Sequence, residues 1–162
     1  MKLKYGILMF FMIVFQLSFG QCNFNTNKVY GVVVRQFEPS LIAYDDNYQI
    51  GMALGNVEKD LILTVVVRFK SSAKRIGSNL LVFTHGKEAV DLELIASQKD
   101  YLDDSEISLT KYKIEINQIQ LLKENYLKTL RFRFENEDIM RTFEVQRNNA
   151  VLSEQIKCFT FN

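Results

Sequence analysis

The sequence predicts an all-β protein, either an antiparallel β-sandwich or a flattened barrel, with one short helix near residues 117–125. Several segments of strand length alternate apolar and polar residues and are separated by turn-forming residues, which is typical of these folds. One of them, Leu61–Phe69, is apolar on both parities for most of its length, which favours a central strand. No long helical pattern alternates with the strands, and this disfavours a doubly wound α/β fold.

Three strands are expected in the first half of the chain. Val29–Gln36 is rich in valine, and Tyr48–Leu54 follows the turn-forming motif at 45–47. Leu61–Phe69 carries consecutive valines, whose branched side chains lose freedom in helices and pack well on a pleated surface.

Two hairpins are expected in the second half, with one more strand between them. They pair Asn79–Thr84 with Ala89–Ala96, and Leu127–Phe134 with Ile139–Arg147. Gly86 can supply the positive φ that a tight turn between the first two of these strands often needs. We expect Ser97–Glu106 to be a polar connection and Ile107–Ile116 to be a strand.

The short helix is expected to begin at Asn117, which can cap the free backbone amides. Gln120 stands three residues later, as a capping box requires, and Ile116 can meet Leu121 as a hydrophobic staple. Asn125 can end the helix in the left-handed region. One further helical turn is expected in the C-terminal tail.

The strand parities also assign residues to the core, because alternate side chains of a strand point to the same face. The residues expected to be largely buried are Leu63, Val65, Val67, Phe83, Leu92, Leu94, Ile114, Leu122, Phe132 and Phe143.

Residues 1–20 have the three parts of a secretory signal peptide. Two lysines form a basic start, an apolar run covers 7–15, and the small residues Ser18 and Gly20 fit a cleavage site. The apolar run is shorter than the roughly 20 residues of a membrane-spanning helix. We therefore expect cleavage after Gly20 and a single β-rich domain over 21–162, either secreted or periplasmic.

Cleavage changes the charge of the chain. It removes two lysines and no acid, which leaves 18 basic and 19 acidic residues and a net charge of −1. A near-neutral domain lacks the basic surface on which nucleic-acid binding depends. We expect no nucleic acid, no cofactor and no membrane span. A partner is expected to be another envelope or extracellular protein, and the oligomeric state stays open.

The two cysteines, Cys22 and Cys158, stand at opposite ends of the expected mature chain. Exported proteins fold in an oxidising compartment, where paired cysteines usually form a disulfide. The alternatives are free thiols, a bridge to another chain, or lipidation of Cys22. Lipidation is disfavoured because Gln21, the residue before the cysteine, is not small.

The sequence contains no recognisable catalytic motif. It has no Gly-x-Ser-x-Gly elbow, and His85, its one histidine, falls in an expected hairpin turn. A single histidine also excludes a metal site built from several histidines. Three acidic clusters, at 45–47, 100–106 and 135–138, could supply oxygens to calcium, but none has the spacing of an EF-hand loop.

Two polar regions form a candidate binding surface. Arg131 and Arg133 share the outer face of an expected strand, where they could recognise an anionic group or pair with acids across the strand. The other region is the acidic connection, with Asp100, Asp103, Asp104 and Glu106. We expect a non-enzymatic binding or assembly module. The alternative is a small-molecule carrier or small hydrolase with a site assembled from scattered residues.

Four features carry a family resemblance. They are the signal that ends at Gly20-Gln21, the hairpin SNLLVFTHGKEAVDLELI, and the strand–helix–strand IEINQIQLLKENYLKTLRFRFE, with a cysteine near the end of the chain. Together they resemble small secreted β-rich proteins of Gram-negative-type bacteria, a group of unknown function. The resemblance implies a β-sandwich-like domain and carries no catalytic residues.

Overall fold

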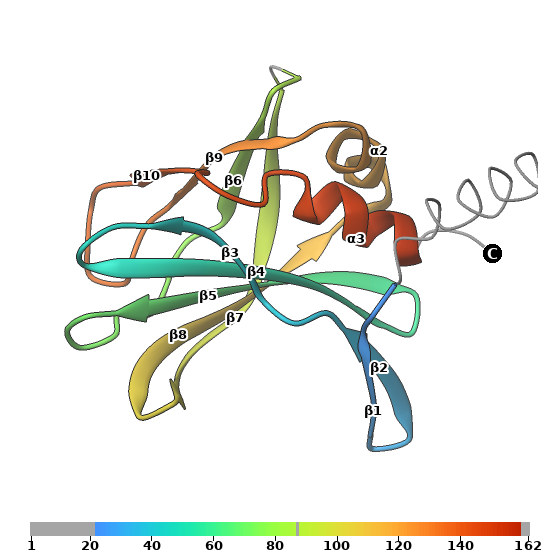
Figure 1. Cartoon of the computed structure of the whole chain (residues 1–162), viewed down its shortest axis with the longest axis horizontal. Helices are drawn as coiled ribbons and strands as arrows, with labels where there is room; N and C mark the ends of the chain where they lie inside the picture. The colour runs from blue at the N-terminus through green and yellow to red at the C-terminus, as the bar shows by residue number, and fades with distance from the viewer. Residues whose placement is uncertain (1–21, 87, 160–162) are drawn as a thin grey trace, which may run out of the picture.

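The computed structural model describes residues 22–86 and 88–159, which form antiparallel β-structure with two short helices (Figure 1). The predicted fold class is confirmed; the expected signal at 1–20 lies outside the described residues. In chain order the elements are β1 (Asn25–Val29), β2 (Val32–Gln36), β3 (Ser40–Tyr44), β4 (Tyr48–Val57), β5 (Asp60–Phe69), β6 (Leu80–Thr84), β7 (Ala89–Leu102), β8 (Ser105–Ile114), α2 (Ile116–Glu124), β9 (Leu127–Phe132), β10 (Arg141–Glu144) and α3 (Val151–Phe159).

The strands form one folded sheet in the order β1-β2-β4-β5-β8-β7-β6-β9-β10, with β3 paired to β4. The long strand β7 belongs to two ladders: Ala89–Leu92 pairs with β6, and Glu93–Leu102 pairs with β8. A register shift at Ile95 lies just after this change of partner, within the ladder with β8. Such a bulge bends a strand, which lets β7 lead from one layer into the other. Figure 1 shows β9 and β10 lying over β4 and β5.

The edge of β3 meets the chain that follows β10. The backbone N–H groups of Gln146 and Arg147 donate to the carbonyl of Ile42 at 2.9 and 3.2 Å. The backbone N–H of Tyr44 donates to Oε1 of Gln146 at 3.1 Å. These bonds join the two edges without a regular ladder, so the sheet approaches a flattened barrel but is not closed.

The core lies between the two layers and contains most of the residues assigned to it. Leu63, Val65, Val67, Leu92, Ile114, Leu122, Phe132 and Phe143 are buried, as predicted. Phe83 is a wrong assignment: Leu80 and Val82 are the inward residues of β6, so Phe83 lies half-buried on the outer face. Leu94 is also only half-buried, and it packs against the margin of the core.

The helix α2 begins earlier than predicted. Glu115 is its N-cap, and the backbone N–H of Glu115 donates to Oε1 of Gln118 at 2.8 Å. The predicted cap at Asn117 is therefore wrong by two residues, and Ile116 is 87% exposed and forms no staple. Asn125 is extended, with φ −122°, and its side-chain amide donates to the carbonyl of Leu121 instead.

The C-terminal tail forms a full helix, α3, where only one turn was expected. The Ser153 hydroxyl donates to the carbonyl of Lys123 in α2. Oε1 of the buried Gln155 accepts the backbone N–H of Leu54 in β4 at 2.8 Å. None of the described helices has the length and apolar character needed to span a bilayer.

The Cys22–Cys158 disulfide is confirmed, with the two α-carbons 5.6 Å apart. It joins α3 to the chain just before β1. Phe24, Phe37 and Phe159 pack beside it, with ring centroids 5.3–5.7 Å apart. The disulfide and this aromatic cluster fix the base of the β1–β2 hairpin.

Three strand boundaries differ from expectation. Val29–Gln36 is not one strand, because the chain reverses at Tyr30-Gly31 between β1 and β2. Ser97–Glu106 is not a connection, because β7 and β8 continue through it to a turn at 103–104. The last hairpin is shorter than predicted, and Ile139 lies outside β10 and is 76% exposed.

Candidate functional site

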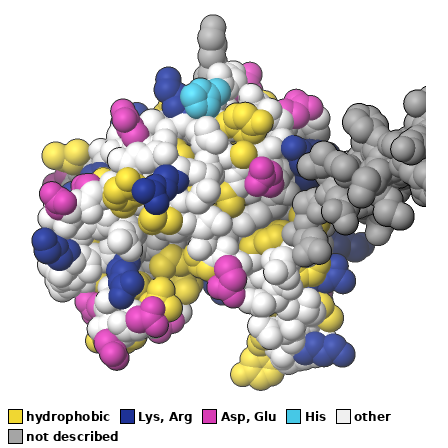
Figure 2. All heavy atoms as spheres, in the orientation of Figure 1, with side chains coloured by type: hydrophobic (Ala, Val, Ile, Leu, Met, Phe, Trp, Pro, Cys, Tyr) yellow, Lys and Arg dark blue, Asp and Glu magenta, His cyan; other side chains and the backbone are white. Residues whose placement is uncertain are grey.

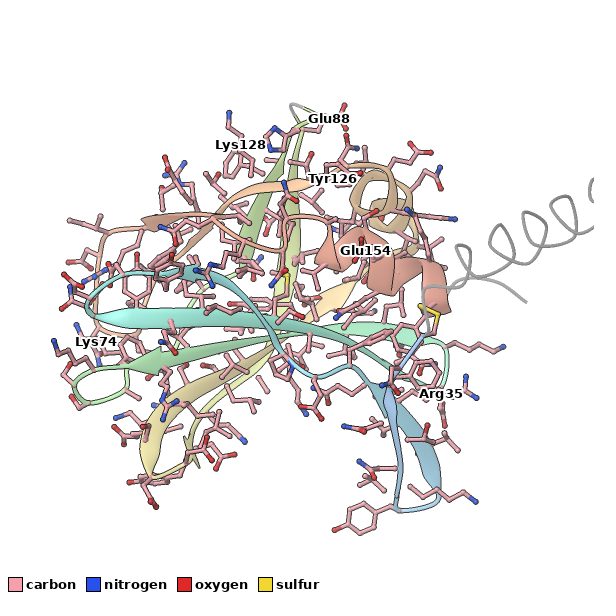
Figure 3. The ribbon with its side chains drawn as sticks, viewed as in Figure 1. Arg35, Lys74, Glu88, Tyr126, Lys128 and Glu154 are labelled. Carbon is pink, nitrogen blue, oxygen red and sulfur yellow. A yellow bond between two sulfur atoms is a disulfide. The ribbon has the colours of Figure 1, made fainter. Side chains whose placement is uncertain are left out.

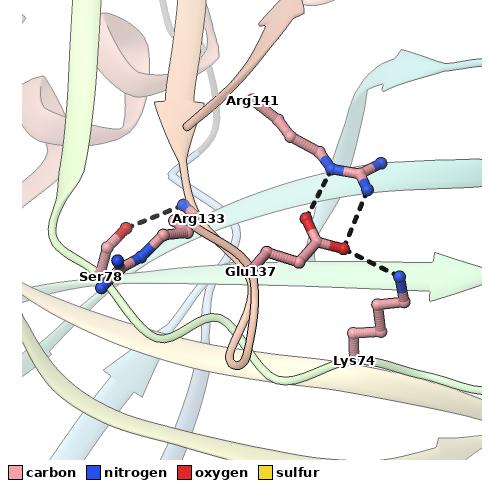
Figure 4. Close-up of polar contacts among 5 residues, drawn as sticks. All are labelled: Lys74, Ser78, Arg133, Glu137 and Arg141. Carbon is pink, nitrogen blue, oxygen red and sulfur yellow. Dashed lines mark hydrogen bonds and ion pairs between the residues drawn. The ribbon is translucent and has the colours of Figure 1, made fainter. Parts of the chain in front are cut away.

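Arg131 and Arg133 lie where β9 passes over the outer surface. The guanidinium carbon of Arg131 is 5.9 Å from the ring centroid of Phe83, close enough for a cation–π contact. Its Nε is buried and makes no hydrogen bond within the described residues. The backbone of Arg133 is bonded to Gly77 and Ser78, each at 2.9 Å (Figure 4). The Arg131 side chain is thus partly used in packing the sheet, whereas these bonds of Arg133 involve only its backbone.

The acidic residues 100–106 form the tip of the β7–β8 hairpin. Asp103 and Asp104 are the two turn residues, with φ of 47° and 60°. Glu106 has a structural role, since its carboxylate accepts the backbone N–H of Ala73 at 2.7 Å and lies 3.6 Å from Nζ of Lys99. No ion pair within the described chain engages Asp103 or Asp104.

The structure does not join the two predicted regions into one surface. β9 lies in the upper half of Figure 1, and the tip of β7–β8 lies at the lower left. Within the described residues, 22–86 and 88–159, no hydrogen bond or ion pair connects either arginine to the acids at 100–106. Recognition through the arginines and binding through the acidic tip therefore stay separate predictions.

The other acidic clusters have structural partners. Oδ1 of Asp45 accepts the backbone N–H groups of Asn47 and Tyr48 at 2.6 and 3.0 Å, so it caps a turn. Glu137 binds both Lys74 and Arg141, as Figure 4 shows. Among the described residues, no three histidine, cysteine or acidic side chains gather as metal ligands would.

His85 follows β6, and its backbone N–H donates to the carbonyl of Tyr126 at 3.0 Å. The side chain borders a shallow depression of about 230 Å³ together with Lys128, Thr129 and Glu144. A catalytic base must reach its nucleophile and its orienting carboxylate within hydrogen-bond distance. No such bond from His85 is present in the described part of the chain.

Sequence reasoning missed the β1–β2 hairpin, because it treated Val29–Gln36 as one strand. Figure 1 shows the hairpin projecting at the lower right, and every residue of β1 is exposed. Only Val34–Gln36 of β2 pairs with β4. Tyr30, at the tip, is fully exposed and has φ of +50°, while Gly31 has φ of +86°. A bulky side chain in this conformation costs about 1 kcal/mol, and here no packing offsets that cost.

Apolar side chains recur from this hairpin along the outer face of the sheet, with Lys111 and Lys113 among them. Register places Val34 opposite Val57 and Val66 opposite Leu109, all on the side that faces away from the core. We call the whole set the notch face: Val29, Val32, Val34, Val57, Ile62, Val66 and Leu109. Val29 is 50% exposed and Val57 is 37% exposed.

Two projecting hairpins flank this face, and they differ in charge. Figure 2 shows the molecule hollowed between them, with basic side chains on the right-hand projection and acidic ones at the tip of the left-hand one. The basic projection is the β1–β2 hairpin, whose Lys28 and Arg35 lie on the face opposite Val29, Val32 and Val34. The acidic one is the β7–β8 tip, where Tyr101 is 72% exposed and Leu102 is 48% exposed.

Comparison with protein families, curated proteins and solved structures finds no match for this chain. The notch face and its two hairpins are therefore assigned from geometry alone.

Proposed function

We propose that this protein is an exported, non-enzymatic binding or assembly module that contacts a protein partner through the β1–β2 hairpin and the notch face. The observation that carries the proposal is Tyr30, fully exposed at the tip of a projecting hairpin with φ of +50°. A strained, unpacked aromatic residue lowers stability, so its presence suggests a role in recognition. Aromatic side chains are also favoured at the centres of protein interfaces.

Export is supported by the Cys22–Cys158 disulfide, since such bonds persist in oxidising compartments. The signal-like segment at 1–20 predicts that the mature chain begins at Gln21. Mass spectrometry of protein isolated from its native cell should give this N-terminus. A retained Met1 or a lipid on Cys22 would contradict the proposed processing.

A carrier or hydrolase is supported less well. A depression of about 560 Å³ is open to solvent between α3 and the β2–β3 connection, beside Phe37 and the disulfide. A ligand site usually combines an enclosing apolar wall with a few convergent polar groups. The notch face has the exposed apolar surface and bordering charges that suit a protein partner better.

Photo-crosslinking in the native cell tests the proposal. A photoreactive phenylalanine analogue replaces Tyr30 in one variant and Tyr126 in the other. Tyr126 is a matched control because it is also an exposed tyrosine, at 54%, and lies far from the hairpin bearing Arg35 (Figure 3). We expect defined protein adducts from position 30 and few from position 126. Equal yields from both positions, or turnover of a substrate through His85, would overturn the proposal.

A further inference from the structure

A further depression lies on the outward face of the sheet, at the end away from the β1–β2 hairpin. It is where the β3–β4 turn, at the left of Figure 1, approaches the end of β5. Its volume is about 350 Å³, and its charged or hydroxyl-bearing lining residues include Asp45, Asp46, Arg68, Lys70 and Ser105. Three parts of the chain that are distant in sequence therefore place polar groups around one hollow, as in a ligand site.

The Arg68 side chain is held in place from two sides. Its Nη2 donates to Oγ of Ser105, at the start of β8, at 2.7 Å. Strand register places Arg68 beside Ile107 on the outward face, and Ile107 is only 4% exposed, so an apolar surface supports the arginine stem. A guanidinium that is already fixed loses little conformational freedom when it binds a ligand.

The two cations of the depression have no anionic partner. Within the described residues, neither Arg68 nor Lys70 forms an ion pair. A guanidinium has five N–H donors, and the Ser105 hydroxyl accepts from Nη2 alone, so Arg68 keeps donors for a carboxylate. Lys99 and Glu106 lie on the opposite face of the β7–β8 hairpin and pair with each other, which leaves this balance of charge unchanged.

The acids around the depression disfavour a simple anion as its ligand. Oδ1 of Asp45 caps the turn, and Asp46 makes no hydrogen bond or ion pair within the described part of the chain. Asp100 shares the outward face with Arg68, two strands away, and the acidic turn at 103–104 directly precedes β8. Carboxylates placed in this way repel an anion and attract an ammonium group. The lining therefore suits a ligand that carries both charges.

We propose that this depression binds a small zwitterion of the amino-acid class, with one carboxylate and one ammonium group. Arg68 and Lys70 bind the carboxylate, and Asp46 binds the ammonium group. The volume lies near the lower end of the range for small-molecule pockets, which suits a ligand of a few carbons. The site does not include Tyr30 or the notch face, so the inference goes beyond the proposed function and does not depend on it.

NMR titration of the mature, oxidised protein at constant ionic strength tests the proposal. Glycine, β-alanine and γ-aminobutyrate separate the two charges by increasing lengths, whereas acetate, methylamine and inorganic phosphate each carry charge of one sign. We expect at least one of the three amino acids to shift the amide signals of 45–49 and 68–70. Its dissociation constant should be lower than those of acetate and methylamine, because only a zwitterion satisfies both kinds of charge.

Substitutions in the lining make the test specific. Arg68→Gln should raise the dissociation constant by about tenfold or more, and Arg68→Lys should restore part of the affinity. Lys70→Gln and Asp46→Asn should each raise it about two- to fivefold, since these groups are exposed. They should leave the thermal midpoint unchanged, which keeps the test valid if Arg68→Gln unfolds the protein. Lys128→Gln is the matched control for Lys70→Gln, because it removes the same charge at the top of Figure 3, away from the depression.

The outcomes decide the proposal independently of the crosslinking experiment. A protein whose 45–49 and 68–70 signals respond to none of the three amino acids has no such site. Acetate or inorganic phosphate that binds as tightly as the best amino acid would overturn the assignment of a zwitterion. An equal effect of Lys128→Gln and Lys70→Gln would show a general effect of charge and would also overturn it. Crosslinking from position 30 reports only on the proposed function, because Tyr30 is not part of this depression.

Discussion

At the scale of single residues, two phenylalanines on paired strands lie on opposite faces of one sheet. Phe132 of β9 is fully buried and stacks on Phe143, with ring centroids 4.5 Å apart. Phe83 of β6 faces outward under Arg131. Strand parity therefore determines which of the two rings stabilises the core.

Truncating each ring tests this difference. Phe132→Ala should lower the free energy of unfolding by about 3–5 kcal/mol, because it removes a buried ring and leaves a cavity. Phe83→Ala should cost much less, since its ring is only half-buried. Urea unfolding of both variants measures the two losses. Equal losses would place Phe83 in the core.

Glu137 connects the 70–78 segment to the last hairpin. Hydrogen bonding from Lys74 lowers the pKa of Glu137, burial opposes this, and Arg141 adds to the lowering. A lowered folded-state pKa means that the carboxylate contributes stability above its ordinary value of 4.5 and loses it as the pH falls below that value.

Glu137→Gln should therefore destabilise the protein near pH 7 by no more than about 1 kcal/mol, because exposed ion pairs are weak. The difference from wild type should shrink as the pH falls through 4.5 and below, where the wild-type carboxylate becomes protonated. Urea midpoints measured across this range provide the check. A difference that is constant with pH would show that charge is not the cause.

At the scale of elements, the β1–β2 hairpin has a turn that its residues fit poorly. Both central residues have positive φ, as a type I′ turn requires, and Asn-Gly is the favoured pair. Tyr30→Asn should therefore slow hydrogen exchange in β1 and β2 and leave the thermal midpoint unchanged or higher. The same change should weaken association, whereas Tyr126→Asn should not. Association that survives Tyr30→Asn would remove tyrosine from the binding surface.

The regular strands could be predicted from the sequence, and the irregular ones could not. The sequence predicts β5 because its consecutive valines favour a central strand. It predicts β4 because a turn motif precedes that strand. The hairpin at Tyr30-Gly31 was missed because tyrosine is not a turn-former. The full length of β7 was missed because the bulge at Ile95 reverses the side-chain parity.

The candidate site was harder to predict than the fold. Parity correctly placed Arg131 on an outer face, and the expected export of a chain with two cysteines led to the correct disulfide. Strand order, however, follows from pairings between distant segments, which a single sequence does not specify. The sequence therefore could not show that the acids at 100–104 lie apart from Arg131, nor which outward residues of β2, β4, β5 and β8 share one face.

At the scale of the whole molecule, the disulfide links residues 136 positions apart. Replacing both Cys22 and Cys158 with serine should lower the free energy of unfolding by about 2–5 kcal/mol, mainly because the unfolded chain gains freedom. Urea unfolding of the variant and of the wild type, with and without reductant, measures this loss. If reductant leaves the free energy of unfolding of the wild type unchanged, the bridge contributes nothing to its stability.

The contacts of the C-terminal segment also determine when the fold can be completed. Gln146 meets β3, Gln155 meets β4, and Cys158 meets Cys22, so three early parts of the chain depend on its last section. A chain that emerges from its N-terminus can form β4–β5 and β7–β8 early, because those pairings are local. It cannot cover the other edge of β3 or secure the base of the β1–β2 hairpin until the segment from Gln146 to Cys158 has arrived. During synthesis or export, the incomplete chain therefore exposes its strand edges, and a chaperone that covers such edges would act in that interval.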